Sequence, residues 1–573
     1  MGRFMDRVQA VQNAIEYHER TKHHFGRFAR SLGYMDWAAR PDPFRSYRGA
    51  PTILLDEVPP GDEPTLDGVY QPLTLIPSTL NLRFLSQLLY DALALSAWKE
   101  LGGNRWPLRC NPSSGNLHPT EGYLLCGPES SVDDEAGLYH YSPLLHALEQ
   151  RARLSTDLWR QLSSGLPEGG VLLGLTSIHW RESWKYGERA YRYCQLDAGH
   201  AIAALSYAAA AQGWQATLLE AVGDDDLGAL LGVADQRGPE REHPECLMAF
   251  APAHARELGR AATTWRPSAA IIERLAKVDL AGRPNRLSRD HHVWPVIEDA
   301  SEACRKPPDV HLEKLPPSTL WPSPSSVEPR GESARKIFRQ RRSAVDMDGR
   351  TWLDLAAFYR MLSALLPSAG RPPLSSLPFT PAIHVIIFVH RVRDLEPGFY
   401  VLARPSDQKN GLRAALRGDF LWERPAGCPE QLPLFFLARA DARRLAQDVS
   451  CHQAIASDGA FAVSMMSEFK PRLEQHGPWF YRRLFWEAGA IGQVLYLEAE
   501  AVGVRATGIG CFFDDAIHEI LGLNEQEKTY QVLYNLTVGG PLEDERLGTS
   551  ASYAHREEAL ARLGLSASTR PSP

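Results

Sequence analysis

The stretch GERAYRYCQLDAGHAIAALSYAAAAQGWQATLLEAVGDDDLGALLGV, residues 187–233, recurs 290 positions later without a gap as GPWFYRRLFWEAGAIGQVLYLEAEAVGVRATGIGCFFDDAIHEILGL, residues 477–523. Identical residues meet along both copies, from Tyr191-Arg192 against Tyr481-Arg482 to Leu231-Gly232 against Leu521-Gly522. A self-similarity of this length indicates a duplicated domain, because each copy is large enough to bury its own core. We therefore predict a fused tandem dimer whose functional site lies between the copies.

Composition and charge exclude several classes of protein. The 573 residues, with 44% hydrophobic and 23% charged residues, fit two large globular domains, and a net charge of -7 argues against a general nucleic-acid-binding protein. The longest apolar stretch, 201–211, is shorter than the ~20 residues that a membrane-spanning helix needs, and the N-terminus lacks the apolar core of a signal peptide. The eight cysteines show no Cys-x-x-Cys spacing. We expect a cytoplasmic protein without a metal site, a membrane partner or a nucleic-acid partner.

The order of predicted elements is the same in both copies, which we place at residues 1–266 and 331–573 with a proline-rich connector at 267–330. In copy one, apolar spacing predicts a helix over 82–101, strands over 122–126 and 137–141, and a long helix over 191–212. Copy two repeats this order with a helix over 351–366, strands over 384–390 and 398–402, and a long helix over 481–502. Helices around a mainly antiparallel sheet make the predicted fold class α+β.

A polar loop, Asn111-Pro112-Ser113-Ser114-Gly115-Asn116-Leu117-His118-Pro119, separates a predicted helix from a predicted strand. Its hydroxyls, its amides and a glycine that lets the backbone come close suit hydrogen bonding to the edge of a flat heterocycle. The same residue types are typical of an ordinary surface turn. The residue types alone leave both interpretations open.

This loop resembles the Pro-Ser-Ser-x-Asn-x-Gln-Pro flavin loop of the nitroreductase family, with Pro112, Ser113, Ser114 and Asn116 in place and His118 where the family has glutamine. Further motifs in the expected order are similar to the SagB/ThcOx branch of that family: 137–143, Lys185-Tyr186 and 198–200. The resemblance covers most of both copies apart from the connector. It implies two tandem nitroreductase-like domains that form a pseudo-dimer within one chain, and an FMN cofactor.

Copy two carries the complementary motifs of the family. Arg341-Arg342-Ser343 matches the motif that binds the FMN phosphate, where guanidinium groups and a hydroxyl suit a dianion. As a bare triplet it is also typical of a solvated basic surface. Gly508-Ile509-Gly510 matches the loop beside the flavin ring, and Arg546 matches a C-terminal phosphate contact.

Two unequal sites follow from the resemblance, because family homodimers build each flavin site from both subunits. Site one joins the loop at 112–118 with 341–343, 508–510 and Arg546, and is complete. Site two would join 367–370 with 18–22 and 218–220, but Arg371 stands where asparagine is expected and Glu220 replaces the second glycine. We predict one FMN per chain.

Lys185 and Tyr186 match a Lys-Tyr pair that azoline dehydrogenases of this branch use near the flavin, whereas copy two has Gln475-His476. In such a dehydrogenation the flavin accepts a hydride while a base removes a proton, and a lysine or tyrosine with a lowered pKa suits the role of base. The alternative interpretation is a helix-start pair that makes ordinary surface bonds. The aromatic and basic stretch 34–47 fits either a substrate lid or a packed N-terminal arm.

The sequence and the resemblance together favour an FMN-dependent oxidoreductase that dehydrogenates a peptide-derived or small heterocyclic substrate, of the azoline-to-azole type. One alternative is an NAD(P)H-dependent nitro or quinone reductase, which needs no separate glycine-rich dinucleotide fold. A second alternative is a catalytically idle binding scaffold in a peptide-modifying complex. Since the fusion already supplies the pseudo-dimer, we expect a monomeric chain.

Overall fold

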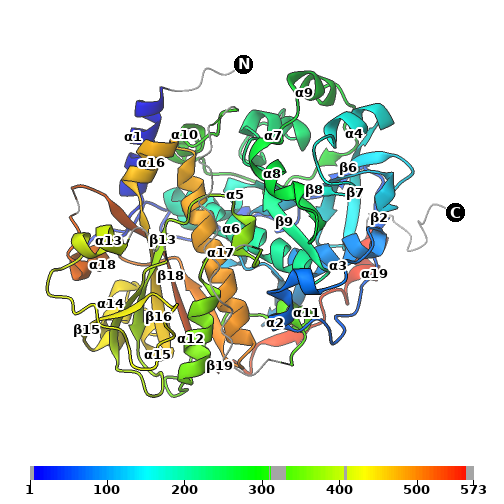
Figure 1. Cartoon of the computed structure of the whole chain (residues 1–573). Helices are drawn as coiled ribbons and strands as arrows, with labels where there is room; N and C mark the ends of the chain where they lie inside the picture. The colour runs from blue at the N-terminus through cyan, green and yellow to red at the C-terminus, as the bar shows by residue number, and fades with distance from the viewer. Residues whose placement is uncertain are drawn as a thin grey trace.

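The computed structural model describes residues 6–308, 310, 331–368, 370–404, 409–524 and 526–562. Two antiparallel sheets, one per copy, lie on either side of a central pair of long helices (Figure 1). Within the described residues, every helix is too short or too polar to cross a membrane. The α+β prediction is confirmed.

The sheet of the first domain has seven strands, all paired antiparallel. Their order is β2 (Thr52–Leu54), β7 (Ala147–Leu154), β6 (Ala136–Ser142), β5 (Thr120–Cys126), β8 (Val171–Ser177), β10 (His243–Pro252) and β9 (Trp214–Leu218). The helices of this half are α1 (Arg7–Arg20), α2 (Leu66–Val69), α3 (Leu82–Ala92), α4 (Thr156–Leu162), α5 (His179–Tyr186), α6 (Ala190–Ala210), α7 (Asp224–Leu230) and α8 (Glu257–Thr264).

The second domain repeats this arrangement in a six-stranded antiparallel sheet. Its order is β15 (Leu434–Arg439), β14 (Gly398–Leu402), β13 (Ile383–Val389), β16 (Phe461–Glu468), β18 (Tyr530–Gly539) and β17 (Arg505–Ile509). Its helices are α11 (Ala334–Gln340), α12 (Leu355–Ala364), α13 (Lys409–Ala415), α14 (Ala442–Val449), α15 (Ile455–Asp458), α16 (Lys470–His476), α17 (Phe480–Glu500) and α18 (Asp514–Leu521). The predicted duplication is therefore visible strand by strand.

The long helices α6 and α17 pack against each other in the middle of the molecule (Figure 1). Two glycines bring the backbones close: a Cβ at Gly199 would collide with the backbone of Trp486, and one at Gly489 with that of Leu196. One continuous hydrophobic cluster extends through both copies around these helices. The interface between the copies is thus a shared core of the kind found in obligate dimers.

The predicted helix over 82–101 is wrong in its second half. α3 ends at Ala92, and β3 (Leu95–Leu101) follows, paired with β4 (Asn104–Arg109) and with β20 (Gly548–Ser550). The apolar stretch there is short enough to suit either a helix or a strand. Its pairing partner β20 lies some 450 residues away in sequence. Tertiary pairing therefore decided the conformation.

The chain after β20 crosses to the first domain, where α19 (Arg556–Arg562) lies beside β2 and α3 (Figure 1). The buried Tyr553 donates from its hydroxyl to the carbonyl of Pro143 (2.9 Å), and Arg556 donates to the carbonyl of Leu55 (2.7 Å). The first half of the connector also packs on this domain through α9 (Ala269–Leu275), α10 (Pro295–Ala303) and the strand pair β1–β11 (Tyr47–Arg48 with Arg283–Pro284). The proline-rich part of the connector, 311–330, lies outside the described residues. These contacts extend the first domain beyond the proposed boundary at residue 266.

Candidate functional site

A cavity of about 580 Å³ lies between the two domains, within the range of ligand-binding sites. Residues predicted from both copies line it together. From the first domain come Pro112, Ser113, Ser114, Asn116, Lys185 and Tyr186, and from the second come Arg341, Arg342, Ser343, Gly508, Ile509 and Gly510. The structure thus brings together motifs that lie up to 398 positions apart, from Pro112 to Gly510.

The polar loop takes a tight, left-handed course along one wall of the cavity. Gly115, Asn116 and His118 all have positive φ angles, of 56°, 60° and 53°. The loop is held from below by Asp197 of α6, whose carboxylate accepts from both the backbone N–H and the hydroxyl of Ser114, each at 3.0 Å. Such strain in non-glycine residues is typical of functional sites that the surrounding structure holds in place.

Two glycines of β17 and its following turn form a cradle in the opposite wall. A Cβ at Gly508 would collide with the Tyr534 hydroxyl, and a Cβ at Gly510 would collide with the ring of Tyr193. Tyr193 also donates to the Gly510 carbonyl at 3.0 Å. Glycine at both positions keeps this wall flat, so that a planar group can approach the backbone.

Two arginines directly after α11 supply positive charge to the cavity. The buried Arg341 donates to the carbonyls of Arg109 (3.0 Å) and Cys110 (3.2 Å), while Arg342 donates to the carbonyl of Ser96 (2.9 Å). Burial lowers the pKa of Arg342 to about 10, which leaves it charged at neutral pH. Six cationic side chains line the whole cavity against three carboxylates: Lys99, Arg109, Lys185, Arg341, Arg342 and Arg505 against Asp197, Glu543 and Asp544. The cavity as a whole therefore suits an anionic ligand.

Two predicted residues do not line the cavity. His118 is buried behind the loop, where its ring faces the carbonyl of Pro107 (3.3 Å) and its backbone N–H donates to Ser113 (2.8 Å). Arg546 has a side chain that is 79% exposed and pairs with Asp544 at 2.7 Å. Arg505 of β17 lines the cavity in this region and pairs with Glu543 (2.6 Å).

Lys185 and Tyr186 end α5 with their polar tips beside Gly115, where a Cβ would lie 3.0 Å from Lys185 Nζ. Burial lowers the pKa of Lys185, which makes it a better base near neutral pH. Burial and the nearby Glu182 raise the pKa of Tyr186, so Tyr186 lacks the lowered pKa that the role of base requires. Of the two, only the lysine suits the role of a base.

Sequence reasoning missed several side chains of the cavity. Tyr193 and Asp197 follow each other by one turn on α6, and Tyr496 of α17 accepts from the Gly508 N–H at 2.8 Å and bonds Ser343 at 2.9 Å. Burial raises the pKa of Asp197 to about 7. The repeat could have indicated these residues, because each differs from its twin 290 positions away: Tyr193 from Arg483, Asp197 from Glu487 and Tyr496 from Ser206.

Those differences fill the region that corresponds to site two. Arg483 pairs with Glu220 at 2.9 Å and Glu487 pairs with Arg404 at 2.6 Å, all four buried. The guanidinium of Arg371 lies 4.3 Å from the centre of the Tyr70 ring. Two buried ion pairs thus stand at positions whose twins in the first site include Tyr193 and Asp197 of the cavity wall.

The assignment of residues 18–22 to site two is wrong. Lys22 pairs with Asp515 of the second domain at 2.8 Å, away from Glu220, which pairs with Arg483. α2 precedes α3 in the first domain as α11 precedes α12 in the second, so α2 is the twin of α11. The residues just before these two helices, Thr65 and Ser333, pair with each other. The segment after α2 contains no arginine. Residues 18–22 are not at the 290 offset from 341–343, which falls at 51–53, so only the order of the helices in the fold identifies the twin segment.

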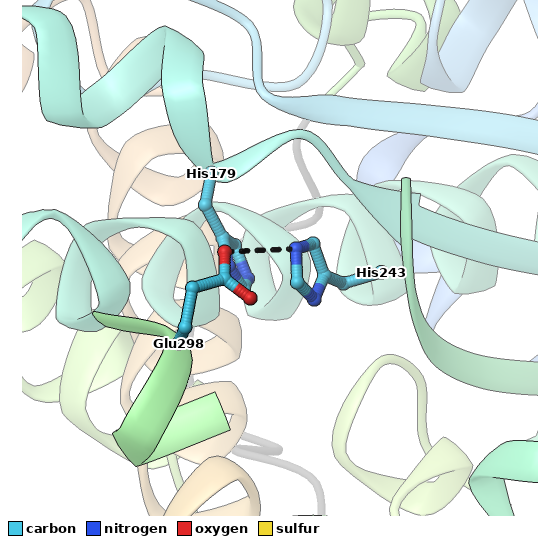
Figure 2. A group of neighbouring side chains, drawn as sticks. All are labelled: His179, His243 and Glu298. Atoms are coloured by element: carbon cyan, nitrogen blue, oxygen red, sulfur yellow. Dashed lines mark ion pairs between the residues drawn. The ribbon is translucent and has the colours of Figure 1, made fainter. Parts of the chain in front are cut away.

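A separate group of side chains, His179, His243 and Glu298, has ligand-type atoms within 4.8 Å of one another (Figure 2). The two imidazoles stack face to face, with 3.7 Å between ring centres and 20° between planes. Glu298 lies 3.7 Å from His243 and also pairs with Arg241. Parallel rings direct their lone pairs alongside each other, and Arg241 already neutralises the carboxylate, so this geometry does not converge on one ion.

Comparisons with known proteins agree with the fold. The model of the nitroreductase family matches residues 85–251 and 399–540, more than half of the chain. The chain therefore belongs to the nitroreductase family, a family of oxidoreductases, and has two nitroreductase-like domains in tandem. A comparison with curated proteins found no significant match.

Three solved structures are similar to it. A presumed nitroreductase from Anabaena variabilis is 22% identical, with a TM-score of 0.65 over 92% of this chain and 99% of the other. One from Ralstonia eutropha is 17% identical, with a TM-score of 0.25 over 41% and 90%. A chain of the E. coli microcin synthetase McbBCD complex is 19% identical, with a TM-score of 0.25 over 43% and 94%.

Proposed function

We propose that the chain is an FMN-dependent dehydrogenase of the SagB/ThcOx type, which binds one FMN in the cavity between its domains and oxidises a peptide-derived or small heterocyclic substrate. One observation carries the proposal: twelve of the fourteen residues predicted from the family motifs line a single cavity, six from each copy. Two unrelated surface motifs would have no reason to meet there.

The residues present fit FMN. The flat glycine wall at Gly508 and Gly510 suits the isoalloxazine ring, and Arg341 and Arg342 suit the phosphate. The Asn111 side-chain oxygen, which lines the same cavity, is buried without a hydrogen-bond partner in the described structure. A bound ligand with a donor group would satisfy it.

A bound FMN would supply a two-electron acceptor next to the substrate. The chain supplies the proton chemistry: neutral Lys185 takes a proton from the substrate atom adjacent to the one that is oxidised. Tyr186 keeps its proton and donates a hydrogen bond that orients the substrate. Asp197 holds Ser114, and through it the whole polar loop, in the conformation that faces the ligand.

The filled second site supports one FMN per chain, in which Arg483–Glu220 and Arg404–Glu487 replace the open space of the first. The test is the visible spectrum of the purified protein, followed by release and quantification of flavin. We expect one FMN per chain, and a loss of at least tenfold in FMN affinity for Arg342→Ala but no change for Arg439→Ala, whose side chain is 77% exposed. Two FMN per chain would contradict the asymmetry.

The same preparation separates the two alternatives. Steady-state consumption of NAD(P)H with nitro or quinone acceptors would favour a reductase. A colourless protein that takes up no FMN on reconstitution would favour the idle scaffold in a peptide-modifying complex. The proposal requires bound flavin and slow NAD(P)H consumption together.

A further inference from the structure

A second cavity, of about 390 Å³, opens beside the first and shares four lining residues with it, Trp106, Gly115, Asn116 and Lys185. The others are Met35, Trp37, Arg40, Asn104, Leu117 and Trp184. The shared residues include the proposed base, so a molecule in the second cavity can place one end beside Lys185. We call this second cavity the tryptophan pocket.

Three indole rings give the tryptophan pocket its character. Trp37 and Trp184 meet edge to face at 5.6 Å, and Trp184 donates from its ring N–H to the Asp36 carbonyl at 2.8 Å. Trp106 comes from β4, the strand that precedes the polar loop in the chain. Flat aromatic walls favour a flat aromatic guest through stacking and edge-to-face contacts.

The charged side chains that line the tryptophan pocket are all positive. Arg40 and Lys185 line it, and none of the described residues that line it carries a carboxylate. Arg40 lies 5.9 Å from the centre of the Trp37 ring, and both Arg40 and Lys185 are exposed to solvent. A guest therefore gains most if it carries a negative charge near Arg40.

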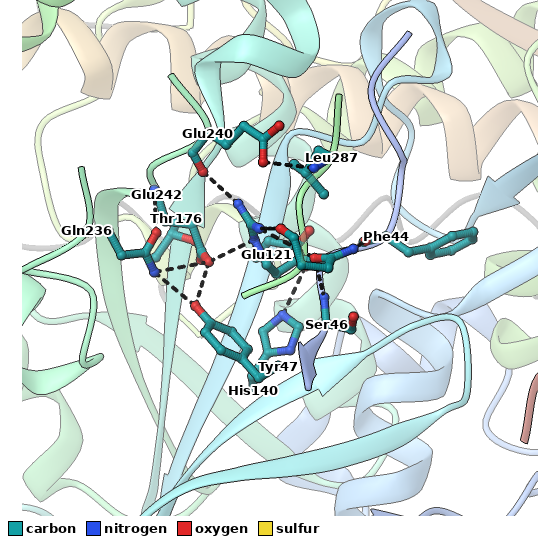
Figure 3. A network of polar contacts seen from close by, with 12 residues as sticks. Phe44, Ser46, Tyr47, Glu121, His140, Thr176, Gln236, Glu240, Glu242 and Leu287 are labelled. Carbon is teal, nitrogen blue, oxygen red and sulfur yellow. Dashed lines mark hydrogen bonds and ion pairs between the residues drawn. The ribbon is translucent and has the colours of Figure 1, made fainter. Parts of the chain in front are cut away.

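The wall that carries Met35, Trp37 and Arg40 is the N-terminal arm, and the arm is firmly anchored. Figure 3 shows part of the buried network behind it, where Glu242 accepts from the hydroxyls of Tyr47 and Thr176, each at 2.7 Å. The hydroxyl of Tyr123 also donates to Glu242, at 2.7 Å. Arg45 of the arm donates to the carbonyls of Asn285 and Glu240 in the same region. The segment 34–47 is thus packed at its Arg45–Tyr47 end, and its outer part, where the Asp36 carbonyl accepts from Trp184, forms one side of the pocket.

We propose that the tryptophan pocket binds the aromatic or heteroaromatic ring of an anionic substrate, with a carboxylate beside Arg40 and the bond to be oxidised next to Lys185. This inference rests on the proposed function and names the substrate class for that site. A carboxylate at the end of a peptide and one on a free small molecule have the same chemistry here.

The test is calorimetric binding of small probes to the protein as purified. Indole-3-acetate has the ring and the anion, tryptamine the ring with a cation, and cyclohexylacetate the anion without an aromatic ring. We expect indole-3-acetate to bind about tenfold more tightly than either of the others. Equal binding of tryptamine, or equal binding of cyclohexylacetate, would overturn the proposal.

Two variants locate the binding. Trp37 is 66% exposed, so Trp37→Ala leaves the core intact, and Trp352→Ala, at a tryptophan 49% exposed in the other domain, is its matched control. We expect Trp37→Ala and Arg40→Gln each to weaken indole-3-acetate binding about fivefold, and Trp352→Ala to leave it unchanged. Binding that ignores both pocket variants would place the probe elsewhere and contradict the proposal.

Two further measurements distinguish a peptide substrate from a free small molecule, and a failure of the substrate class from a failure of the proposed function. N-acetyl-Gly-Gly-Trp carries the same ring and carboxylate at a peptide end, and tighter binding than indole-3-acetate would assign a peptide substrate, whereas weaker binding would assign a free small molecule. The flavin content of each variant is measured on the same sample. If the unmodified protein contains no flavin, the proposed function is contradicted. If it contains flavin but does not bind the probes selectively, only the proposed substrate class is contradicted.

Discussion

The rings of Tyr191 and Tyr481, twins in the repeat, stack on each other across the domain interface with 6.1 Å between centroids and 11° between planes. The residues that follow them make reciprocal ion pairs: Arg192 with Asp514 at 2.7 Å and Arg482 with Asp224 at 2.6 Å. Each copy thus gives the other the same contact, as in a twofold dimer. The aspartates lie in the first turns of α18 and α7, where the helix dipole also favours them.

Removing one of these aspartates should destabilise the fold strongly. Asp514→Ala leaves Arg189 and Arg192 buried without their shared partner, and we expect the free energy of unfolding to fall by about 3–5 kcal/mol. The control is Asp225→Ala, which removes a carboxylate 59% exposed to solvent and should cost less than about 1 kcal/mol. Urea unfolding of both variants measures the difference, and equal losses would show that the buried pair has no special role.

Filling the glycine wall should expel the flavin. In Gly508→Ala the new methyl group meets the Tyr534 hydroxyl and pushes it toward the cavity, so we expect FMN affinity to fall at least tenfold while the fold survives. Gly418→Ala is a matched control, because a Cβ there meets nothing within 4 Å and its φ is ordinary. Flavin fluorescence titration gives both affinities. Unchanged FMN binding in Gly508→Ala would remove this wall from the proposed site.

Replacing the proposed base should remove turnover without removing flavin. We expect Lys185→Gln to lower kcat by about 10²–10⁴-fold, the usual contribution of a general base. Because the base must be neutral, kcat should rise with pH through the lowered pKa of Lys185 and lose this rise in the variant. Tyr186→Phe should keep the pH dependence, since the raised pKa leaves the tyrosine protonated throughout. A rise of kcat with pH that is lost in Tyr186→Phe and kept in Lys185→Gln would contradict this division of roles.

Stability should decline as the pH falls below about 6.5. Burial lowers the pKa of His179 to about 3, whereas the unfolded chain takes up a proton near the ordinary histidine value of about 6.5. The unfolded state therefore binds more protons between these values, and this histidine alone costs about 2 kcal/mol between pH 7 and 5. His179→Phe should lose less stability over that range than the unmodified protein, and His254→Phe, at an exposed position, should behave like the unmodified protein. Parallel pH curves for all three would contradict the assignment.

Much of the architecture was readable from the chain because it follows from local rules. The periodicity of 191–212 and 481–502 marked α6 and α17 within two residues at each end, since a buried helix must repeat its apolar pattern every 3.6 residues. The loop at 112–118 and the segments at 341–343 and 508–510 were recognisable because each motif has a fixed spacing within a few residues. Their meeting in one cavity followed from the resemblance, and the structure shows that meeting.

The sequence by itself determined the duplication, the α+β class and the short motifs, all of which depend on neighbours in the chain. Only the tertiary structure decided that β3 leaves the predicted helix to pair with β20, that Tyr193 and Asp197 face the cavity, and that Arg546 faces solvent. It alone showed that Arg483 and Glu220 close the second site and that the arm at 34–47 walls the tryptophan pocket. These outcomes depend on contacts between segments far apart in the chain, where the gain from packing and charge pairing outweighs local preference.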